Sequence, residues 1–337
     1  MNKIYFYVPN KKFIVDWPVD FWPSLLSFLK SHKHIRFDGP YGHTLHPYVY
    51  FRSLGLPCEL VSSWPIDEGI IMAHSDFLSA SRTPQENQTI VEIKPDRAIR
   101  CPFANFYIIQ NRHDPITRWR SRSFLKSIFV NNWPQPGLLP RDPGRGNLFE
   151  NICFIGNQRQ MYPGLQSLGS ALLNLGLKWK IITDRSAWHD YREVDAIVAL
   201  RRQLDYDYPA KPGNKLYNAW LAGVPAILGP ERAYRTIGKR NIDYLEAKTV
   251  EESIEQIKFL QTNLMARNTL VQFGAARAAK FRCEQTAERW RDFTIKTIIP
   301  HHRRWINSPM LRHQFFAVRG FYVRFLHKRY YHDIKWV

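Results

Sequence analysis

The segment that most constrains the fold of this chain is 211–231, which reads KPGNKLYNAWLAGVPAILGPE. It predicts a loop, a short helix, a turn and a buried strand in quick succession. We expect Asn214 to cap a helix that begins at Lys215, and Gly223 to supply the left-handed exit at its end. Residues 226–228 are wholly apolar, as in a strand buried inside a parallel sheet. Units of this kind build α/β domains.

The start of the expected helix is also suited to an anion. Lys211 and Lys215 place two positive charges there, and the free N–H groups of a helix start add further positive potential. An ordinary helix of an α/β domain would show the same periodicity. The pattern alone therefore leaves a phosphate site and a plain helix both open.

Candidate strands and helices alternate along the chain. We expect strands at 4–8, 59–61, 70–73, 105–110, 127–130, 151–155, 179–182 and 196–200. We expect helices at 20–30, 165–175 and 249–263. This alternation predicts parallel, doubly wound sheets, in which ligands bind beyond the carboxyl ends of the strands. The Pro- and Gly-rich stretch 134–146 predicts a linker between two domains.

The segment described first resembles the donor-binding segment of GT-B glycosyltransferases, especially the retaining group called group 1 or family 4. Those enzymes carry a pattern like E-x-x-x-x-x-x-x-E-A-M-A-x-G-x-P-V-V-A-S. Ala219, Gly223 and Pro225 match its A, G and P. Ala210 stands where the family has the Glu that contacts the sugar, and Asn218 stands where it has the Glu that binds the ribose. The resemblance implies a ribose contact made by an amide, while the first carboxylate is missing.

The resemblance also implies a fold and its division. GT-B proteins have two doubly wound, Rossmann-like domains with a cleft between them. We expect an acceptor-side domain at 1–145, a nucleotide-sugar donor domain at 146–295 and a basic, aromatic helical tail at 296–337.

In the donor domain, the resemblance points to a set of phosphate-binding residues. Family members carry a Gly-Arg pair after the first strand of this domain. Here Gly156 is followed by Asn157, and Arg159 is the nearest cation. Arg201 follows another strand, and its forked guanidinium suits a phosphate. We expect the donor phosphates to be bound by Gly156, Arg159, Arg201, Lys211 and Lys215.

Two alternatives remain beside this set. Arg201 and its neighbour Arg202 can instead form surface ion pairs with Asp205 and Asp207. We favour the phosphate for Arg201 and weigh the two roles evenly for Arg202. We expect the donor ribose and sugar to contact Asn218, Gly229 and Glu231.

The first domain carries two further candidate segments. His74 and Asp76 come at the end of an apolar strand, and in GT-B enzymes of this type such a strand often ends beside the reacting sugar. We expect them to be catalytic, with His74 hydrogen-bonding a sugar hydroxyl or assisting the acceptor and Asp76 orienting it. The second segment, 39–44, predicts a glycine-containing loop with Thr44 capping the next helix. Contacts to the donor from Gly39, Gly42 and His43 compete there with a plain turn.

No metal and no cofactor besides the donor are expected. Asp205 and Asp207 have the spacing of a metal-binding Asp-x-Asp, but they lie just before the donor segment, so we interpret the match as a false positive. Fixed cations and a helix start are expected to stabilise the leaving diphosphate instead. The four cysteines match no metal spacing and indicate free thiols in a reducing cytosol.

The formal net charge is +19, and residues 301–337 hold eight Lys or Arg against one Asp. One face of a predicted helix there carries Leu311, Phe315, Val318, Tyr322 and Phe325, and basic residues occupy much of the remainder: Arg312, Arg319, Arg324, Lys328 and Arg329. The apolar face either packs on the protein or lies on an anionic membrane. No secretory signal and no long apolar run is present. We expect a cytoplasmic protein, peripheral at the inner face of a membrane.

The resemblance implies an enzyme, a glycosyltransferase of the hexosyltransferase type. It would move a sugar from a nucleotide diphosphate donor to a glycan or lipid-linked acceptor, without a metal and with retention. Two other classes stay open. Ala210 and Asn157 favour a non-catalytic GT-B-like protein that binds sugar nucleotides. Only the net charge favours a nucleic-acid-binding protein, and no nucleic-acid motif accompanies it, so nucleic acid is not expected as a partner.

Overall fold

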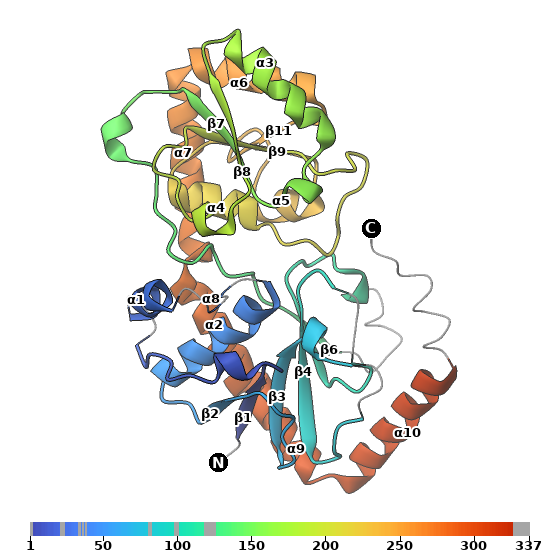
Figure 1. Ribbon diagram of the computed structural model, residues 1–337. Coiled ribbons are helices and arrows are strands. Elements are labelled where there is room, and N and C mark those ends of the chain that lie inside the picture. The colour runs from blue at the N-terminus through green and yellow to red at the C-terminus, as the bar shows by residue number, and fades with distance from the viewer. Residues whose placement is uncertain are drawn as a thin grey trace. The chain divides into compact units, whose positions relative to one another are not determined.

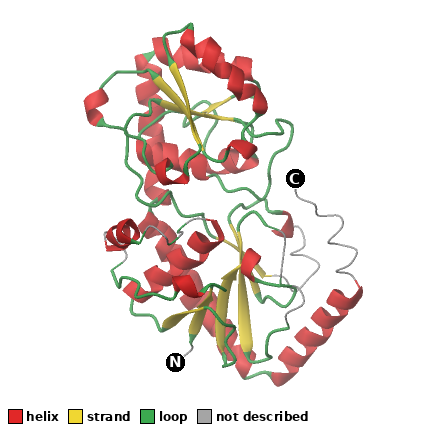
Figure 2. Cartoon of the chain, in the orientation of Figure 1, coloured by secondary structure: helices red, strands yellow, loops and turns green. Residues whose placement is uncertain are grey.

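The computed structural model describes residues 3–20, 24–32, 35, 37, 39–79, 83–97, 101–117 and 126–325, without the side chains of 322–325. The chain forms two compact units (Figure 1). Unit 1 combines residues 1–131 with 286–337, and unit 2 is the continuous segment 132–285. In each unit, helices pack around one sheet (Figure 2).

Unit 1 contains a six-stranded sheet in the order β2-β1-β3-β4-β5-β6, and every neighbouring pair is parallel. Its strands are β1 (Ile4–Tyr7), β2 (Cys58–Val61), β3 (Gly69–His74), β4 (Gln88–Lys94), β5 (Phe106–Ile109) and β6 (Lys126–Phe129). The central strands are buried along their whole length. That burial explains their apolar runs, since helices cover both faces of such a sheet.

The helices of unit 1 come from both ends of the chain. They are α1 (Ser24–Ser31), α2 (Gly39–Ser53), most of α8 (Cys283–Phe293), α9 (Ile299–Ile306) and α10 (Pro309–Phe325). The returning segment enters the core, because Trp305 Nε1 donates to the Glu86 carbonyl at 2.7 Å. His302 Nδ1 lies 2.9 Å from Thr89 Oγ1 on β4. Residues 286–325 are therefore an integral layer of unit 1.

Unit 2 contains a five-stranded parallel sheet in the order β11-β10-β9-β7-β8. Its strands are β7 (Asn151–Ile155), β8 (Lys178–Ile182), β9 (Ala196–Ala199), β10 (Ala226–Leu228) and β11 (Leu245–Glu246). Its helices are α3 (Leu168–Leu173), α4 (Asn214–Ala222), α5 (Arg232–Ile237), α6 (Val250–Thr262) and α7 (Leu264–Ala278). One apolar core runs through the whole unit.

Both sheets reverse their strand order at one point, between β1 and β3 in unit 1 and between β7 and β9 in unit 2. Loops leave the sheet in opposite directions at such a point, which opens a crevice at the carboxyl ends of the strands. The predicted fold class, two doubly wound α/β sheets with a helical C-terminal part, is confirmed.

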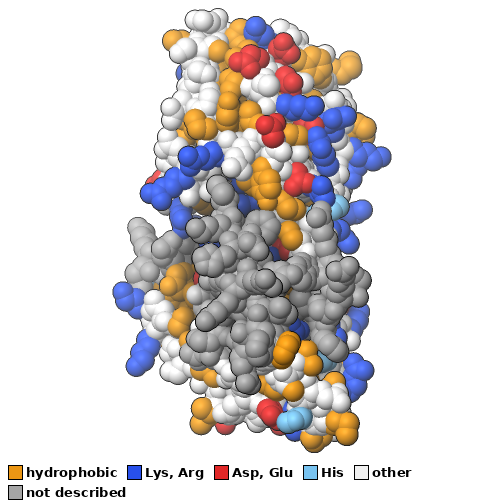
Figure 3. All heavy atoms as spheres, turned by 90° about the vertical axis from the view of Figure 1, so that its right-hand side faces the viewer, with side chains coloured by type: hydrophobic (Ala, Val, Ile, Leu, Met, Phe, Trp, Pro, Cys, Tyr) orange, Lys and Arg blue, Asp and Glu red, His pale blue; other side chains and the backbone are white. Residues whose placement is uncertain are grey.

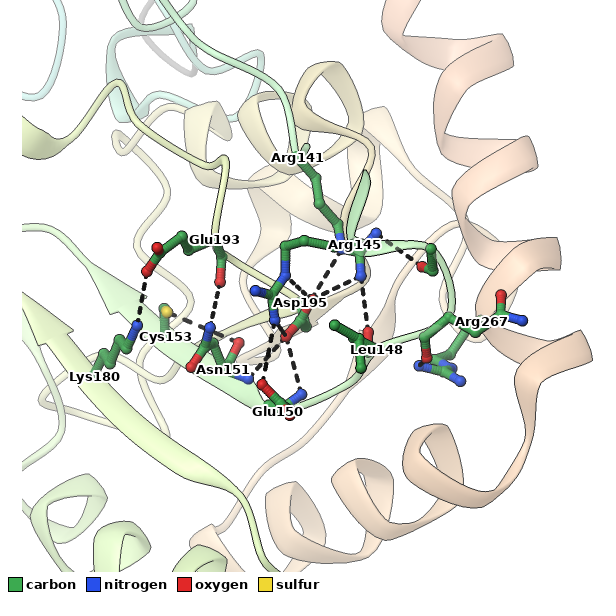
Figure 4. A network of polar contacts seen from close by, with 12 residues as sticks. Arg141, Arg145, Leu148, Glu150, Asn151, Cys153, Lys180, Glu193, Asp195 and Arg267 are labelled. Carbon is green, nitrogen blue, oxygen red and sulfur yellow. Dashed lines mark hydrogen bonds and ion pairs between the residues drawn. The ribbon is translucent and has the colours of Figure 1, made fainter. Parts of the chain in front are cut away.

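The stretch predicted as a linker is bonded to unit 2. Arg141 and Arg145 both reach the fully buried carboxylate of Asp195, at 2.8 and 2.7 Å (Figure 4). The backbone N–H groups of Glu150 and Asn151 donate to the same carboxylate. Burial alone would raise the pKa of Asp195, but these hydrogen bonds hold it below its ordinary value. The chain therefore enters β7 along a fixed path. The predicted domain boundary at 145/146 stays a prediction, and by its contacts the chain divides at 131/132.

The predicted loop at 39–44 is wrong, because these residues form the first turns of α2. Thr44 caps no helix, and its hydroxyl instead donates to the Pro40 carbonyl one turn earlier. A Cβ on Gly42 would lie 2.8 Å from the Phe37 carbonyl oxygen. Gly42 therefore serves close packing of backbone against backbone, a use of glycine that the sequence does not distinguish from a turn.

Candidate functional site

The candidate site lies at the switch point of the sheet in unit 2. Gly156 directly follows β7, Arg201 follows β9, Glu231 follows β10, and Lys215 is in the first turn of α4 (Figure 1). These four residues come from separate stretches of the chain. The parallel sheet brings them together because the carboxyl ends of its strands meet at one edge.

Lys215 points back toward the end of β7. Its amino group donates to the Ile155 carbonyl and lies 4.6 Å from the centre of the Phe154 ring. Burial, and next the positive charge of Arg201, lower the pKa of Lys215 from 10.5 to about 7, against the opposing effect of Glu231. An anion bound here would restore the charge of this lysine.

Gly156 is required by the position of Lys215. Its φ of +146° lies in a region that other residues rarely adopt, and a Cβ there would come within 2.7 Å of the Lys215 nitrogen. The bare backbone of Gly156 therefore makes room for the amine, and the structure brings these two residues together.

Arg201 is held by a buried carboxylate. Its Nε donates to Glu231 Oε2 at 2.6 Å, and the Glu231 side chain is 2% exposed. Burial alone would lower the pKa of Arg201, but the carboxylate of Glu231 more than offsets this and raises it. Neither predicted alternative, Asp205 or Asp207, is this partner, and Asp207 pairs with Arg232 at 2.6 Å. Within the described part of the chain, Glu231 Oε1 is buried and has no hydrogen-bond partner.

Three aromatic residues complete the site and were not predicted. The Arg201 guanidinium lies 5.2 Å from the centre of the Tyr208 ring, a cation–π distance. Tyr234 lies close enough to Glu231 that this carboxylate, after burial, raises its pKa. Phe154 faces Lys215 as described above. Tyr234 lies three positions after Glu231, in the first turn of α5, and this spacing is a signal that could have indicated it.

The other predicted donor contacts lie nearby with partners of their own. The buried Asn218 accepts a hydrogen bond from the Gln135 backbone at 3.1 Å, so its amide oxygen is engaged within unit 2. The Lys211 N–H donates to the Tyr208 carbonyl, and the Gly229 N–H donates to the Ala199 carbonyl. Arg159 is exposed in the short helix after Gly156. The roles predicted for these four residues stay predictions.

The helix start at α4 differs in detail from the prediction. α4 begins at Asn214, the capping position is Gly213, and no side chain caps it. Asn214 as the cap is therefore wrong. The predicted exit is confirmed, because Gly223 has the left-handed angles φ 70° and ψ 35°. Without a side-chain cap, the first N–H groups of α4 keep their capacity to bind an anion.

In unit 1, the structure joins two segments that were predicted separately. The rings of His43 and His74 stack with centres 5.5 Å apart. His74 Nδ1 accepts a hydrogen bond from the Asp76 N–H at 3.0 Å, so the proton of the neutral ring must be on Nε2. The Asp76 carboxylate meets Arg97 at 3.2 Å. Asp76 thus orients His74 through its backbone.

The electrostatics of His74 limit its chemistry. The side chain is buried, and burial, reinforced by His43, lowers the pKa of His74 to about 2. Burial likewise lowers the pKa of His43 to about 4. At neutral pH His74 is therefore an uncharged hydrogen-bond donor, and it is too weak a base to take a proton in solution.

Within the part of the chain that the structure describes, no group of three or more His, Cys, Asp and Glu side chains is arranged to hold a metal ion. A hollow of about 470 Å³ lies elsewhere on unit 2, beside the network of Figure 4. Its cations are paired with carboxylates, namely Arg145 with Asp195, Lys180 with Glu193, and Arg192 with Asp190. We assign no ligand to it.

The sequence matches no family model. No curated protein matches it either. The structure is similar to a sucrose-phosphate synthase from Thermosynechococcus elongatus, with a TM-score of 0.51 and 12% identity over 75% of this chain and 76% of that one. It is also similar to Anabaena HepE, determined in complex with UDP and glucose, with a TM-score of 0.50 and 12% identity over 88% of this chain and 100% of that one. These likenesses show the fold, which is GT-B. The family 4 assignment and the retaining outcome stay predictions.

Proposed function

We propose that this protein is a glycosyltransferase that uses a nucleotide diphosphate sugar as donor. The observation that carries the proposal is the meeting of Gly156, Arg201, Lys215 and Glu231 at the switch point of unit 2. Two cations, an uncapped helix start and a bare glycine backbone form a site for a diphosphate. The fold supports the proposal, since Anabaena HepE shares it and was determined with UDP and glucose bound.

In this proposal the site stabilises the leaving diphosphate with fixed charge. When the sugar–phosphate bond breaks, negative charge grows on the diphosphate, and Lys215 and Arg201 meet it without having to reorganise. Lys211 adds a third cation, and the Arg201–Glu231 pair keeps the guanidinium in place. No metal is needed for this step, which makes metal independence part of the proposal.

Glu231 and Asn218 are proposed to bind the sugar and the ribose. Glu231 has one carboxylate oxygen held by Arg201 and one buried oxygen to which no described residue donates a hydrogen bond. A buried carboxylate oxygen is a strong acceptor for hydroxyl groups. This acceptor substitutes for the family carboxylate that Ala210 lacks.

On the acceptor side we propose His74 as a donor of a hydrogen bond to a sugar hydroxyl. Its neutral state and its Nε2–H tautomer fit that role, whereas the low pKa argues against a general base. A reaction in which the leaving diphosphate itself takes the acceptor proton needs no enzyme base, and retention of configuration is the outcome that we propose. The acceptor is proposed to be a glycan or a lipid-linked glycan.

The test begins with the donor. Thermal shifts against UDP-, GDP-, ADP- and CMP-linked sugars measure binding, because a ligand that binds only the folded state raises its stability. The donor that shifts the melting temperature is then incubated with the protein and checked for release of the nucleotide. We expect a shift with one nucleoside diphosphate family and slow hydrolysis of its sugar. No shift with any of them would overturn the proposal.

A second candidate is a non-catalytic protein that binds a sugar nucleotide. Ala210 and Asn157 favour it, because they replace a carboxylate and an arginine of the family pattern. Hydrolysis and transfer distinguish the two candidates. Binding of a nucleotide sugar with no release of nucleotide, across a panel of glycan and lipid-linked acceptors, would support the second.

A further inference from the structure

The last described helix, α10, turns Arg312 and Arg319 toward the protein. Arg312 donates to the carbonyl of Trp305 at 2.9 Å and also to that of Ile306, which satisfies the end of α9. Arg319 is 6% exposed and lies 5.1 Å from the centre of the Phe315 ring. A surface helix normally buries its apolar side and exposes its charged side, whereas α10 turns Arg312 and Arg319 inward together with two phenylalanines.

Two phenylalanines fix this orientation. The rings of Phe315 and Trp305 are 5.0 Å apart at their centres, and those of Phe316 and Phe103 are 5.5 Å apart. The apolar face predicted from the sequence is therefore divided. Phe315 packs inward, whereas Leu311 and Val318 are exposed. The remaining predicted positions, Tyr322, Arg324 and Phe325, and Lys328 and Arg329 beyond them, are side chains outside the described residues.

The outward side of α10 is a continuous uncharged face. It consists of positions spaced i, i+1, i+4, i+7, i+8 and i+11, which share one side of an α-helix: Met310, Leu311, Gln314, Ala317, Val318 and Phe321. Four of them are large and strongly exposed, at 75% for Met310, 45% for Leu311, 48% for Val318 and 60% for Phe321. We call these six residues the outer face of α10. An exposed apolar face of this kind marks a surface that meets a partner.

The charge of the surrounding sequence indicates what that partner is. Residues 293–332 contain eight Lys or Arg and no Asp or Glu. Arg303 and Arg304 are exposed at the end of α9, just before α10. The face shown in Figure 3 carries Lys and Arg side chains at many separate points, with hydrophobic side chains and several Asp or Glu side chains between them. An exposed apolar helix face that follows two exposed arginines, in a basic stretch of sequence, matches an anionic lipid bilayer.

We propose that the outer face of α10 docks the protein onto an anionic membrane, with the helix lying in the plane of the interface. Met310, Leu311, Val318 and Phe321 would enter the boundary between headgroups and acyl chains, while Arg303 and Arg304 meet acidic headgroups. Among the described residues no helix is long and apolar enough to cross a bilayer, and docking requires none. This proposal does not depend on glycosyl transfer.

The experiment is co-sedimentation of the full chain with vesicles. One set is phosphatidylcholine with about one quarter phosphatidylglycerol, and the other is phosphatidylcholine alone. The test variant carries Val318→Asp and Phe321→Asp. Both side chains are exposed, so the fold is expected to survive, and the melting temperature checks it. The matched control carries Met265→Asp and Phe273→Asp on α7, which are 79% and 48% exposed and change the net charge equally.

We expect the wild type and the α7 control to pellet with the anionic vesicles and to bind the neutral ones weakly. The α10 variant should partition roughly tenfold less, because two apolar side chains no longer enter the interface. Equal pelleting of the α10 variant and the control would overturn the proposal, and so would absence of binding by the wild type. If the wild type is instead a dimer by analytical ultracentrifugation and only the α10 variant is monomeric, the partner is a second copy and the lipid assignment is wrong.

Discussion

At the scale of single residues, we predict that donor binding depends most on Lys215. Its lowered pKa shows that the folded, ligand-free site resists its charge, and a bound diphosphate would supply the missing counter-charge. We predict that Lys215→Met weakens binding of the donor nucleotide by roughly 10- to 100-fold, the scale of a hydrogen bond to a charged group. Isothermal titration calorimetry measures this. Lys180→Met, which removes a lysine paired with Glu193 outside the site, should leave the affinity unchanged.

The lowered pKa of Lys215 predicts how the stability of the ligand-free protein and the donor affinity each depend on pH. Because its folded pKa of about 7 lies below the unfolded value of 10.5, the unfolded chain binds more protons between these values. Through this group, the stability of the ligand-free protein therefore rises as the pH increases from 7 to about 10. Lys215→Met should thus melt no lower than the wild type at pH 7. Donor affinity runs the other way, falling above pH 7 in the wild type but not in the variant. A clear drop in the melting temperature of the variant would make Lys215 a structural residue.

His74 predicts an effect on turnover without an effect on nucleotide binding. We expect His74→Ala to lower turnover by roughly 100-fold, the scale for losing one positioned hydrogen-bond donor, with the nucleotide affinity preserved because the proposed phosphate site lies in unit 2. His313→Ala, on α10, is the control. Since the pKa of His74 is about 2, nitrogen NMR should show a neutral Nε2–H ring that does not titrate between pH 5 and 8. A titration near pH 6.5 would contradict the assigned environment.

At the scale of elements, two glycines that follow a strand and a helix of unit 2 allow the effect of backbone strain to be distinguished from the effect of a contact with Lys215. Gly156 and Gly223 both have positive φ, so alanine at either position costs about 1 kcal/mol of stability. At Gly223 no atom of the described residues lies within 4 Å of the added methyl group, whereas at Gly156 the methyl group meets the Lys215 amine. We predict that both variants lose comparable stability in thermal unfolding and that only Gly156→Ala loses donor binding. Loss of binding by both would show that the strain, and not the contact with Lys215, is responsible.

Helices and strands that are determined by the residues within and directly beside them could be predicted from the sequence. The helix and strand of 214–228 follow from their apolar spacing and from the glycine and proline that punctuate them. β4 was missed because it carries Glu92, a buried carboxylate satisfied by Ser75 and by the Cys101 N–H. The first turns of α2 were predicted as a loop because Gly39, Pro40 and Gly42 are typical of turns.

The pairing within the site depends on the fold and was not predictable. Arg201 and Glu231 are 30 positions apart and meet only because β9 and β10 are neighbours. The sequence suggested each residue separately as a donor contact, but it offered nearby aspartates as the partner of Arg201. The stacking of His43 on His74 is similar, since it requires α2 to pack beside β3. Residue types at strand ends thus indicate a site, while their mutual contacts follow from the order of the strands.

At the scale of the whole molecule, the path of the chain predicts that unit 2 can fold as a separate fragment and that unit 1 cannot. Unit 2 is continuous, has its own core, and contains all of Gly156, Arg201, Lys215 and Glu231. Unit 1 needs both ends of the chain, since Trp290 and Trp305 are buried in it from residues beyond 286. We predict that the fragment 132–285 folds alone and binds the same nucleotide as the full chain within roughly tenfold in affinity, since a segment of this length can bury a sufficient core.

The fragment 1–131 is the matched comparison. Without α9 it loses the hydrogen bonds of Trp305 to Glu86 and of His302 to Thr89 and leaves an apolar face of its sheet uncovered, so it should aggregate or unfold without a cooperative transition. Circular dichroism melts of both fragments, with calorimetric titration of 132–285, decide the outcome. A cooperative melt of 1–131 near that of the full chain would show that the returning helices are an appendage. Failure of a folded 132–285 to bind the nucleotide that the full chain binds would show that the donor site needs residues of unit 1.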